Sequence, residues 1–187
     1  MSSLILAPLP WPAMLAAVAI IFGAGIVRGY AGFGFSALSV AGLALLVSPA
    51  KIVPAIFVLE VLASISLLRS AARDIDWRWL GWLIAGNILC LPLGTLLLAW
   101  LPETPLRLLI GALLLLAAAL LRAGVSLALA PSAGVRLAVG MASGFVNGVA
   151  AIGGIAVAVM LSTSQIAPAV MRATLIALFL FTDLYAL

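Results

Sequence analysis

The sequence contains no histidine, only one cysteine and very few charged residues. Histidine is absent from all 187 residues, and Cys90 is the single cysteine. Within one chain these absences exclude a disulfide, a zinc site built from Cys and His, and catalysis by a Ser-His-Asp triad. We therefore expect no metal site, no cofactor and no enzymatic activity, and we interpret Cys90 as a packing residue.

Charged residues make up only 7% of the chain, whereas hydrophobic residues make up 67%. A soluble domain carries about 25% charged residues, so this composition fits lipid rather than water. Spans of about 20 apolar residues are needed to cross a membrane, and the chain has room for several. The sequence predicts a single all-α, polytopic transmembrane domain over residues 1–187, with the lipid bilayer as its partner. It does not indicate an oligomeric state.

The net charge of +4 does not indicate a nucleic-acid partner, because the basic residues form no run. They lie singly at the ends of apolar segments. One side of the membrane is predicted to carry Arg69, Arg73, Arg78, Arg122, Arg136 and Arg172, and the other side Lys51 and Arg107. Since an excess of Lys and Arg marks the cytoplasmic side, we expect a multi-pass protein with its N-terminus outside. No positive charge precedes the first apolar run, so we expect no cleaved signal peptide.

Prolines, glycines and charged residues divide the apolar sequence into about seven transmembrane or half-membrane helical segments. Ser48-Pro49 and Thr104-Pro105 are typical of helix starts, and Asp76 is typical of an N-cap. The expected segments are residues 13–27, 35–47, 49–70, 77–100, 106–121, 135–148 with a short continuation to 161, and 165–187. The segment 35–47 is too short to cross a membrane comfortably.

Two motifs recur in the same order about 115 residues apart, which is typical of an internal duplication. Residues 25–30 resemble residues 140–145, and residues 51–56 resemble residues 165–170. We therefore predict a first repeat at residues 12–122 and a second, incomplete repeat at residues 133–187. The charge pattern orients corresponding helices in opposite directions, so the repeats are expected to be inverted.

A glycine-rich stretch in each repeat is expected to interrupt a helix. The glycines concerned are Gly29, Gly32 and Gly34 in the first repeat and Gly144, Gly148, Gly153 and Gly154 in the second. An interrupted helix frees backbone N–H groups, and inside a membrane these groups must face protein or a water-filled cavity. We predict that the two stretches form facing binding sites for an anion. The alternative for the same glycines is close helix packing of the GxxxG type.

Arg28 indicates the charge of the expected substrate. A guanidinium stays charged inside the membrane and offers a planar pair of donors to carboxylate, sulfonate or sulfite oxygens. Arg28 lies about 16 residues, or ~24 Å, beyond Pro12 along a helix. The alternative is therefore that its side chain extends to the cytoplasmic interface.

Two further polar residues are candidates for the site. Glu60 lies close to the middle of a predicted span, where it could carry a coupling proton, neutralise Arg28 or donate a hydrogen bond as a neutral acid. Asn147, inside the second glycine stretch, is a candidate substrate contact. Arg172 and Asp183 lie nearer the ends of the last predicted helix, and we expect both to be interfacial anchors.

The motifs together resemble those of the TauE/SafE family, the sulfite exporter-like permeases. The motifs are residues 28–34 with Pro54 downstream, then residues 144–148, 152–154 and 171–174. The resemblance covers about residues 12–187. It implies ion-coupled transport of a small anion, such as sulfite, a sulfonate or sulfoacetate, across the bacterial inner membrane.

The sequence departs from the family pattern in two respects. Gly153-Gly154 is followed by Ile155-Ala156, where such proteins commonly have two prolines, so a tight second interruption is less expected. Members of the family generally run longer, and the partners of segments 77–100 and 106–121 would follow Leu187. We therefore expect a C-terminally truncated chain. The alternative function is a non-transporting membrane scaffold or assembly subunit, or an inactive truncated copy.

Overall fold

The computed structural model describes residues 10–123, 132–163 and 166–187, and every regular element in these residues is helical. The elements are α1 (Trp11–Ala31), α2 (Phe35–Leu43), α3 (Pro49–Ala71), the 3-10 turn η1 (Ala72–Asp74), α4 (Trp77–Trp100), α5 (Glu103–Arg122), α6 (Ala133–Ala150), α7 (Gly154–Thr163) and α8 (Pro168–Ala186). Within the described ranges, 6 helices are long and apolar enough to cross a membrane, namely α1, α3, α4, α5, α6 and α8. The α2 and α7 helices have only 9 and 10 residues. The predicted all-α, polytopic fold is confirmed.

Capping residues define where several of these helices begin. The Asp76 carboxylate accepts hydrogen bonds from the backbone N–H groups of the second and third residues of α4, each at 3.0 Å, as predicted. The Ser132 hydroxyl accepts one from the N–H of Val135 at 3.3 Å and begins α6. Pro49 is the first residue of α3, where the N–H that proline lacks would have no partner within the helix. The α5 helix begins at Glu103, slightly earlier than predicted.

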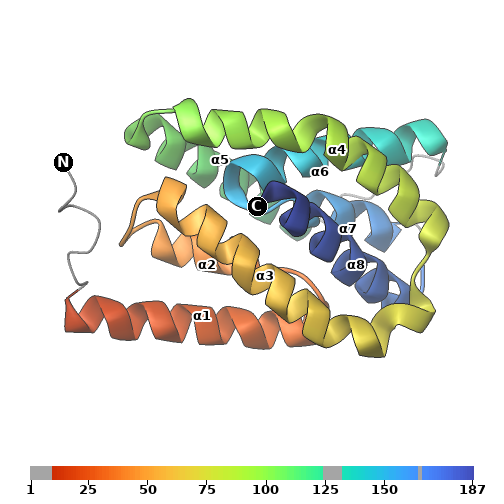
Figure 1. Cartoon of the computed structure of the whole chain (residues 1–187), viewed down its shortest axis with the longest axis horizontal. Coiled ribbons are helices and arrows are strands. Elements are labelled where there is room, and N and C mark those ends of the chain that lie inside the picture. The colour runs from red at the N-terminus through yellow and green to blue at the C-terminus, as the bar shows by residue number, and fades with distance from the viewer. Residues whose placement is uncertain (1–9, 124–131, 164–165) are drawn as a thin grey trace.

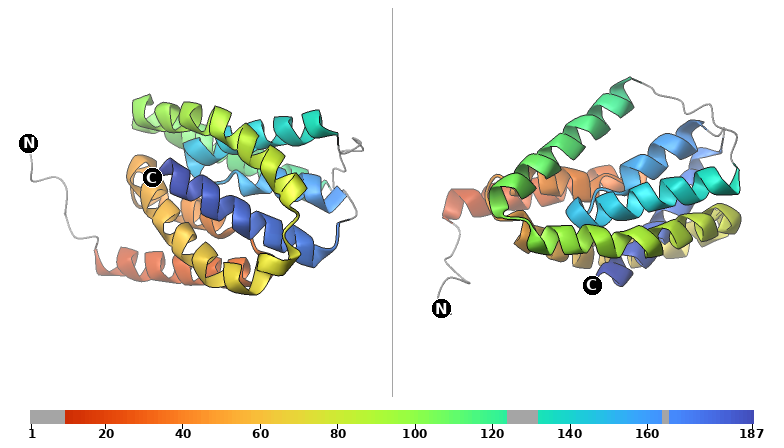
Figure 2. Two further views of the ribbon diagram at one scale, coloured as in Figure 1. Left: turned by 45° about the vertical axis from the view of Figure 1, so that its right-hand side comes forward. Right: turned by 90° about the horizontal axis from the view of Figure 1, so that it is seen from above.

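The long helices lie along the longest axis of the molecule (Figure 1). The α4 helix packs most extensively on α6, and α3 packs on α8. Figures 1 and 2 show that α3 and α8 run in opposite directions, as do α1 and α6. The α5 helix diverges from α6 when the molecule is seen from above (Figure 2). The α8 helix is the most enclosed of the spanning helices, because 44% of an 18-residue stretch of it is buried inside the protein.

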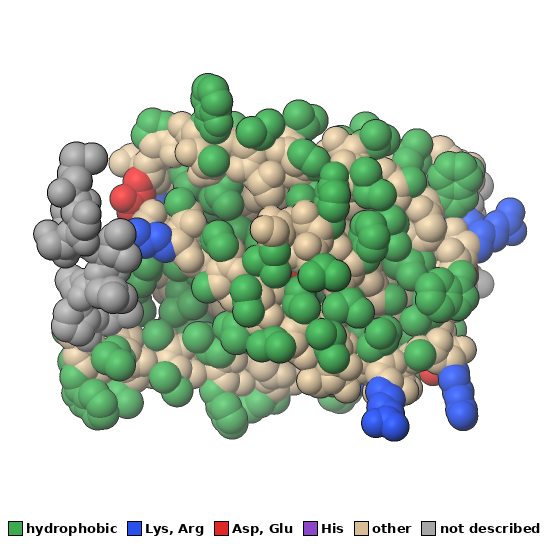
Figure 3. Space-filling view, viewed as in Figure 1, with side chains coloured by type: hydrophobic (Ala, Val, Ile, Leu, Met, Phe, Trp, Pro, Cys, Tyr) green, Lys and Arg blue, Asp and Glu red, His purple; other side chains and the backbone are tan. Residues whose placement is uncertain are grey.

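The surface carries its charged side chains toward the two ends, with an apolar band between them on the face shown in Figure 3. Large apolar side chains of the described chain are strongly exposed, among them Val18 at 65%, Phe22 at 71% and Leu115 at 74%. A monomeric soluble protein rarely exposes so extensive an apolar surface, whereas lipid matches it. The surface therefore agrees with a multi-pass membrane protein.

Corresponding elements of the two halves follow one another at a constant spacing. The matching bounds are Ala31 and Ala150 at the ends of α1 and α6, Phe35 and Gly154 at the starts of α2 and α7, and Pro49 and Pro168 at the starts of α3 and α8. Subtracting 31 from 150, 35 from 154 and 49 from 168 gives 119 residues each time. This register differs by one helical turn from the spacing predicted from the two motifs. The duplication, with bounds 12–122 and 133–187, stays a prediction.

Candidate functional site

Each half of the chain has one interruption between a long helix and a short one. The α1 helix ends where Gly32 and Gly34 adopt left-handed φ angles of 80° and 93°, which residues with side chains disfavour. In the second half, α6 continues through Gly144 and Gly148 without a break. The left-handed residue there is Ala151, with a φ angle of 57°. The second interruption therefore lies within the predicted glycine stretch, but after Gly148 and just before Gly154.

Gly144 and Gly148 lie on the face of α6 that packs against α4. A Cβ atom at Gly144 would lie 2.7 Å from the Cα atom of Asn87, and one at Gly148 would collide with the backbone of Leu91. On α4, a Cβ atom at Gly86 would lie 2.5 Å from the backbone of α6. These glycines therefore allow close helix packing, which is the alternative given for them above. A part for Gly144 and Gly148 in anion binding stays a prediction.

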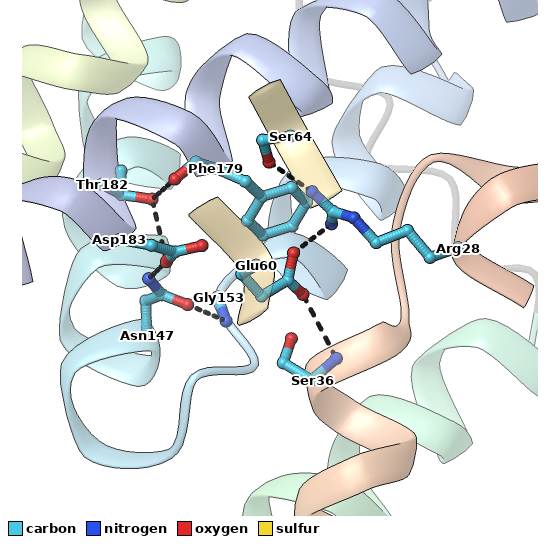
Figure 4. A network of polar contacts seen from close by, with 9 residues as sticks. All are labelled: Arg28, Ser36, Glu60, Ser64, Asn147, Gly153, Phe179, Thr182 and Asp183. Atoms are coloured by element: carbon cyan, nitrogen blue, oxygen red, sulfur yellow. Dashed lines mark hydrogen bonds and ion pairs between the residues drawn. The ribbon is translucent and has the colours of Figure 1, made fainter. Parts of the chain in front are cut away.

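Arg28 is buried in the last turn of α1, with only 1% of the residue exposed. Its Nη1 atom forms an ion pair with Oε2 of Glu60 at 2.5 Å, and its Nη2 atom donates a hydrogen bond to Oγ of Ser64 at 2.6 Å. Both partners lie on α3, one helical turn apart (Figure 4). The alternative in which Arg28 extends to the membrane interface is therefore wrong, and Glu60 neutralises the guanidinium.

Glu60 also contacts the first helix interruption. Its Oε1 atom accepts a hydrogen bond from the backbone N–H of Ser36 at 3.3 Å. Ser36 belongs to the first turn of α2, and the N-terminal turn of a helix carries a partial positive charge that favours a carboxylate. Arg28, Glu60 and the start of α2 therefore form one buried polar cluster.

Asn147 and Asp183 form the corresponding contact in the second half. The Nδ2 atom of Asn147 donates a hydrogen bond to Oδ1 of Asp183 at 2.8 Å, and its Oδ1 atom accepts one from the N–H of Gly153 at 3.2 Å. The hydroxyl of Thr182 is a further, longer donor to Asp183 at 3.4 Å. Asp183 is 1% exposed. The prediction that it is an interfacial anchor is wrong, because α8 turns this residue toward the polar cluster (Figure 4).

The two contacts occupy equivalent places in the two halves. The bonded residues Arg28 and Ser64 are 36 positions apart in sequence, and so are Asn147 and Asp183. The spacing of 119 residues that relates the helix bounds also relates Arg28 to Asn147 and Ser64 to Asp183. In the first half the bond thus joins the end of α1 to the middle of α3, and in the second half it joins the end of α6 to the end of α8.

The aromatic ring of Phe179 lies between the two contacts in the view of Figure 4. Its centroid is 4.8 Å from the guanidinium carbon of Arg28, a distance at which a cation–π interaction is favourable. A side chain at Gly154 would collide with this ring. Gly154 therefore gives Phe179 the space that it needs beside Arg28.

Gly29 and Gly32 contact Arg172 at the start of α8. The Nη2 atom of Arg172 donates a hydrogen bond to the carbonyl oxygen of Gly29 at 2.9 Å. A Cβ atom at Gly32 would lie 2.6 Å from Cγ of Arg172. Arg172 thus joins the end of α1 to α8, in addition to lying near a helix end as predicted.

The structure brings Arg28, Glu60, Asn147 and Gly153 into one network, but it also adds residues that the sequence analysis did not place there. They are Ser36, Ser64, Phe179, Thr182 and Asp183. One signal was available for Asp183, since it is an acid within an apolar run, as Glu60 is. Asp183 lies near the last residue of the chain, however, and this position favours an interfacial anchor.

Residues 17–187 match the protein family described as Sulfite exporter TauE/SafE. No curated protein and no solved structure matches the chain. The family match extends over both helix interruptions and over every residue of the buried network. Members of this family are membrane transporters rather than enzymes. The chain therefore belongs to the TauE/SafE family of sulfite exporter-type membrane permeases.

Proposed function

We propose that this chain moves a small anion, such as sulfite or a sulfonate, across the bacterial inner membrane by ion-coupled alternating access, with Arg28 as the anion-binding group. The observation that carries the proposal is a fully buried arginine beside a helix interruption, inside a transporter of this family. Burying a charge costs several kcal/mol, so a charged residue within membrane spans is usually retained for a function.

The contacts of Arg28 support a site for an oxyanion at its guanidinium. Its Nη1 and Nη2 atoms meet carboxylate and hydroxyl oxygens of Glu60 and Ser64. A sulfite or sulfonate group presents oxygens to the same two donors, because a guanidinium fork binds such groups in a bidentate manner. Glu60 and the substrate therefore compete for one cation.

This competition provides a route to ion coupling. An anion that takes the place of Glu60 on Arg28 leaves the glutamate without its counter-charge. Burial disfavours an unpaired carboxylate, so Glu60 takes up a proton when the anion binds. Anion binding and proton binding are then linked, and one proton accompanies one monovalent anion.

The arrangement of the chain supports alternating access between two sides. The residues of the network come from α1, α2 and α3 in the first half and from α6 and α8 in the second. Helix pairs of opposite direction that meet at interrupted helices are common among secondary transporters. The network residues Arg28, Glu60 and Asp183 are all about 1% exposed, so this conformation is closed to both sides. With the basic ends of α3, α4 and α6 in the cytoplasm, the N-terminus lies outside.

The proposal is tested by flux of labelled sulfite, and then of other small anions, in proteoliposomes containing the whole chain. We expect flux that saturates with concentration and is abolished in Arg28→Gln. The exposed Arg73→Gln variant, in η1, is the matched control and should transport as the unchanged chain does.

Because Arg28→Gln removes the counter-charge of Glu60, Arg28→Lys is measured beside it. Lysine keeps the positive charge but lacks the planar fork, so it should fold and bind the anion more weakly. Unchanged flux in a folded Arg28→Gln protein would contradict the role of Arg28. Flux in no variant and for no small anion would favour the non-transporting scaffold.

A further inference from the structure

Among the described residues, the buried network of Figure 4 contains two carboxyl groups and one basic group. Arg28 lies in the same network as Glu60 and Asp183 (Figure 4), and it pairs with Glu60 at 2.5 Å. Such a cluster carries one excess negative charge if both acids are ionised. In a low-dielectric interior an uncompensated carboxylate is strongly destabilising, so the cluster requires a further positive charge or a proton.

The helices packed on α8 bring no other charged group to Asp183. Within the described chain, the remaining charged residues of α3, η1, α4 and α6 are Lys51, Arg69, Arg73, Asp74, Arg78 and Arg136. Lys51 is exposed in the first turn of α3, and the other five lie at the end of the bundle where α8 begins. Two more charged residues lie at that end, Asp76, whose N–H donates to Thr174, and Arg172, whose side chain donates to the carbonyl oxygen of Gly29. The described residues of α7 contain no charged group. Asp183 is near the opposite end of α8, in the network that holds Arg28 and Glu60 (Figure 4).

The hydrogen bonds of Asp183 leave one of its oxygen atoms unused. Asn147 has a fixed orientation, since its Oδ1 atom accepts from Gly153 and its Nδ2 atom must therefore face Asp183. Asn147 and Thr182 both donate to Oδ1 of Asp183. The Oδ2 atom has no partner among the described residues, and it is fully enclosed. A proton on Oδ2 would neutralise the group without disturbing either bond to Oδ1.

We infer that Asp183 is a proton-binding residue of the transporter, and that the site closes only when this residue is protonated. In the closed conformation the proton is bonded to Oδ2. When the site opens to either side, the O–H bond breaks and the proton passes to water, leaving the carboxylate hydrated. Closure requires the reverse step, because it would otherwise bury the excess negative charge. This part of the inference rests on the proposed transport function, in which the site opens and closes.

The proton on Asp183 differs in its effect from the one that Glu60 takes up. Glu60 competes with the anion for Arg28, so its ionisation changes the anion concentration needed for half-maximal flux. Asp183 controls closure, so its ionisation changes the maximal rate. The neutral form of an acid is lost as the pH rises, and the maximal rate of anion exchange should therefore fall toward alkaline pH.

Infrared spectroscopy of the purified, unliganded chain tests the proton site without any transport. The carbonyl stretch of a protonated carboxylic acid should be present at neutral pH. It should shift when aspartate is labelled with ¹³C at its carboxyl group, and it should not shift when glutamate is labelled. The chain has three aspartates, and the band should persist in Asp74→Asn and vanish in Asp183→Asn. A band that shifts with glutamate labelling, or no band at neutral pH, would overturn the inference.

Exchange of labelled anion at saturating concentration, without a gradient, tests the role in closure. The maximal rate should decline with rising pH in the unchanged chain and in Asp74→Asn. In Asp183→Asn the profile should be flat, because an amide stays neutral and still offers its carbonyl oxygen to Asn147. A declining profile in Asp183→Asn would overturn this role. No exchange in the unchanged chain would instead refute the proposed function and with it the role in closure, while the infrared result would still decide the proton site.

Discussion

Arg28 and Asn147 occupy the same position in the two halves of the chain, each in the last turn of a long helix that ends three residues later. Each donates a hydrogen bond to a side chain 36 positions further along, Arg28 to Ser64 and Asn147 to Asp183. The first half thus places its charge on the donor, and the second half places its charge on the acceptor. This complementary difference gives the closed network one cation and two acids, together with Glu60.

We expect Glu60→Gln to increase the apparent affinity for the transported anion and to remove its pH dependence. In the unchanged chain, ionised Glu60 competes for Arg28, so the concentration for half-maximal flux should rise as the pH rises. Glutamine does not ionise and binds a guanidinium less strongly than a carboxylate does. The measurement is the concentration dependence of anion flux in proteoliposomes over a range of pH.

The matched control for Glu60→Gln is Glu103→Gln, which removes an acid from the exposed pair that Glu103 forms with Arg107 at 2.6 Å. It should leave both the affinity and its pH dependence unchanged. If Glu60→Gln kept the pH dependence of the unchanged chain, Glu60 would have no part in coupling.

The buried pair Arg28–Glu60 and the exposed pair Arg107–Glu103 should differ greatly in their contribution to the free energy of unfolding. Removing one member of a buried pair leaves an uncompensated charge and costs about 3–5 kcal/mol, whereas an exposed pair contributes about 0–1 kcal/mol. Glu60→Ala should therefore lower the free energy of unfolding in detergent by several times more than Glu103→Ala. The double change Arg28→Met with Glu60→Leu should restore much of the loss, because no buried charge remains. Equal losses for the two single variants would contradict the burial of the Arg28–Glu60 pair.

The sequence predicted the helices well because their limits depend on local residues. Asp76 begins α4 and Pro49 begins α3 as expected, and the apolar runs are long enough to be unambiguous. Arg28 and Glu60 were each recognised as polar residues in apolar surroundings. Their contact was not predictable, since it depends on the way α1 and α3 pack. Asp183 was misplaced because sequence position alone does not show which face of α8 is enclosed.

The residue offset that relates the two halves was hard to predict from the sequence for a different reason. Small apolar residues match by chance at many offsets, and an offset one helical turn away keeps every residue on nearly the same helix face. The helix bounds remove this ambiguity, because they align the interruption at Gly34 with the one at Gly153. Once the register is known, the pairing of Asn147 with Asp183 follows from that of Arg28 with Ser64.

We expect substitution of the glycines between α4 and α6 to affect stability before it affects transport. A Cβ atom at Gly86 would lie 2.5 Å from backbone atoms of α6, whereas nothing lies within 4 Å of one at Gly81 on the same helix. Gly86→Ala should cost about 1–3 kcal/mol through overpacking. Gly81→Ala should be neutral or stabilising by up to about 1 kcal/mol, because alanine favours a helix over glycine. Thermal unfolding in detergent measures both.

The same comparison separates the two interpretations of Gly144. If its role is packing, Gly144→Ala should behave like Gly86→Ala, with a lowered unfolding temperature and little change in the half-saturating anion concentration. A normal unfolding temperature with a strongly raised half-saturating concentration would instead support the predicted binding role.

The equivalent left-handed residues of the two interruptions should respond to substitution in opposite directions. Gly32 has a φ angle of 80° and Ala151 one of 57°. A residue with a Cβ atom is disfavoured by about 1–2 kcal/mol in this conformation. Gly32→Ala should therefore destabilise the protein, with a further contribution from Arg172, whose Cγ atom would lie 2.6 Å from the new Cβ atom. Ala151→Gly relieves the same strain, which exceeds the entropy that glycine adds to the unfolded chain, and it should raise the unfolding temperature. The measurement is thermal unfolding of both variants. The control is Gly111→Ala, in the open middle of α5. A gain in stability for Gly32→Ala would contradict the left-handed conformation at the end of α1.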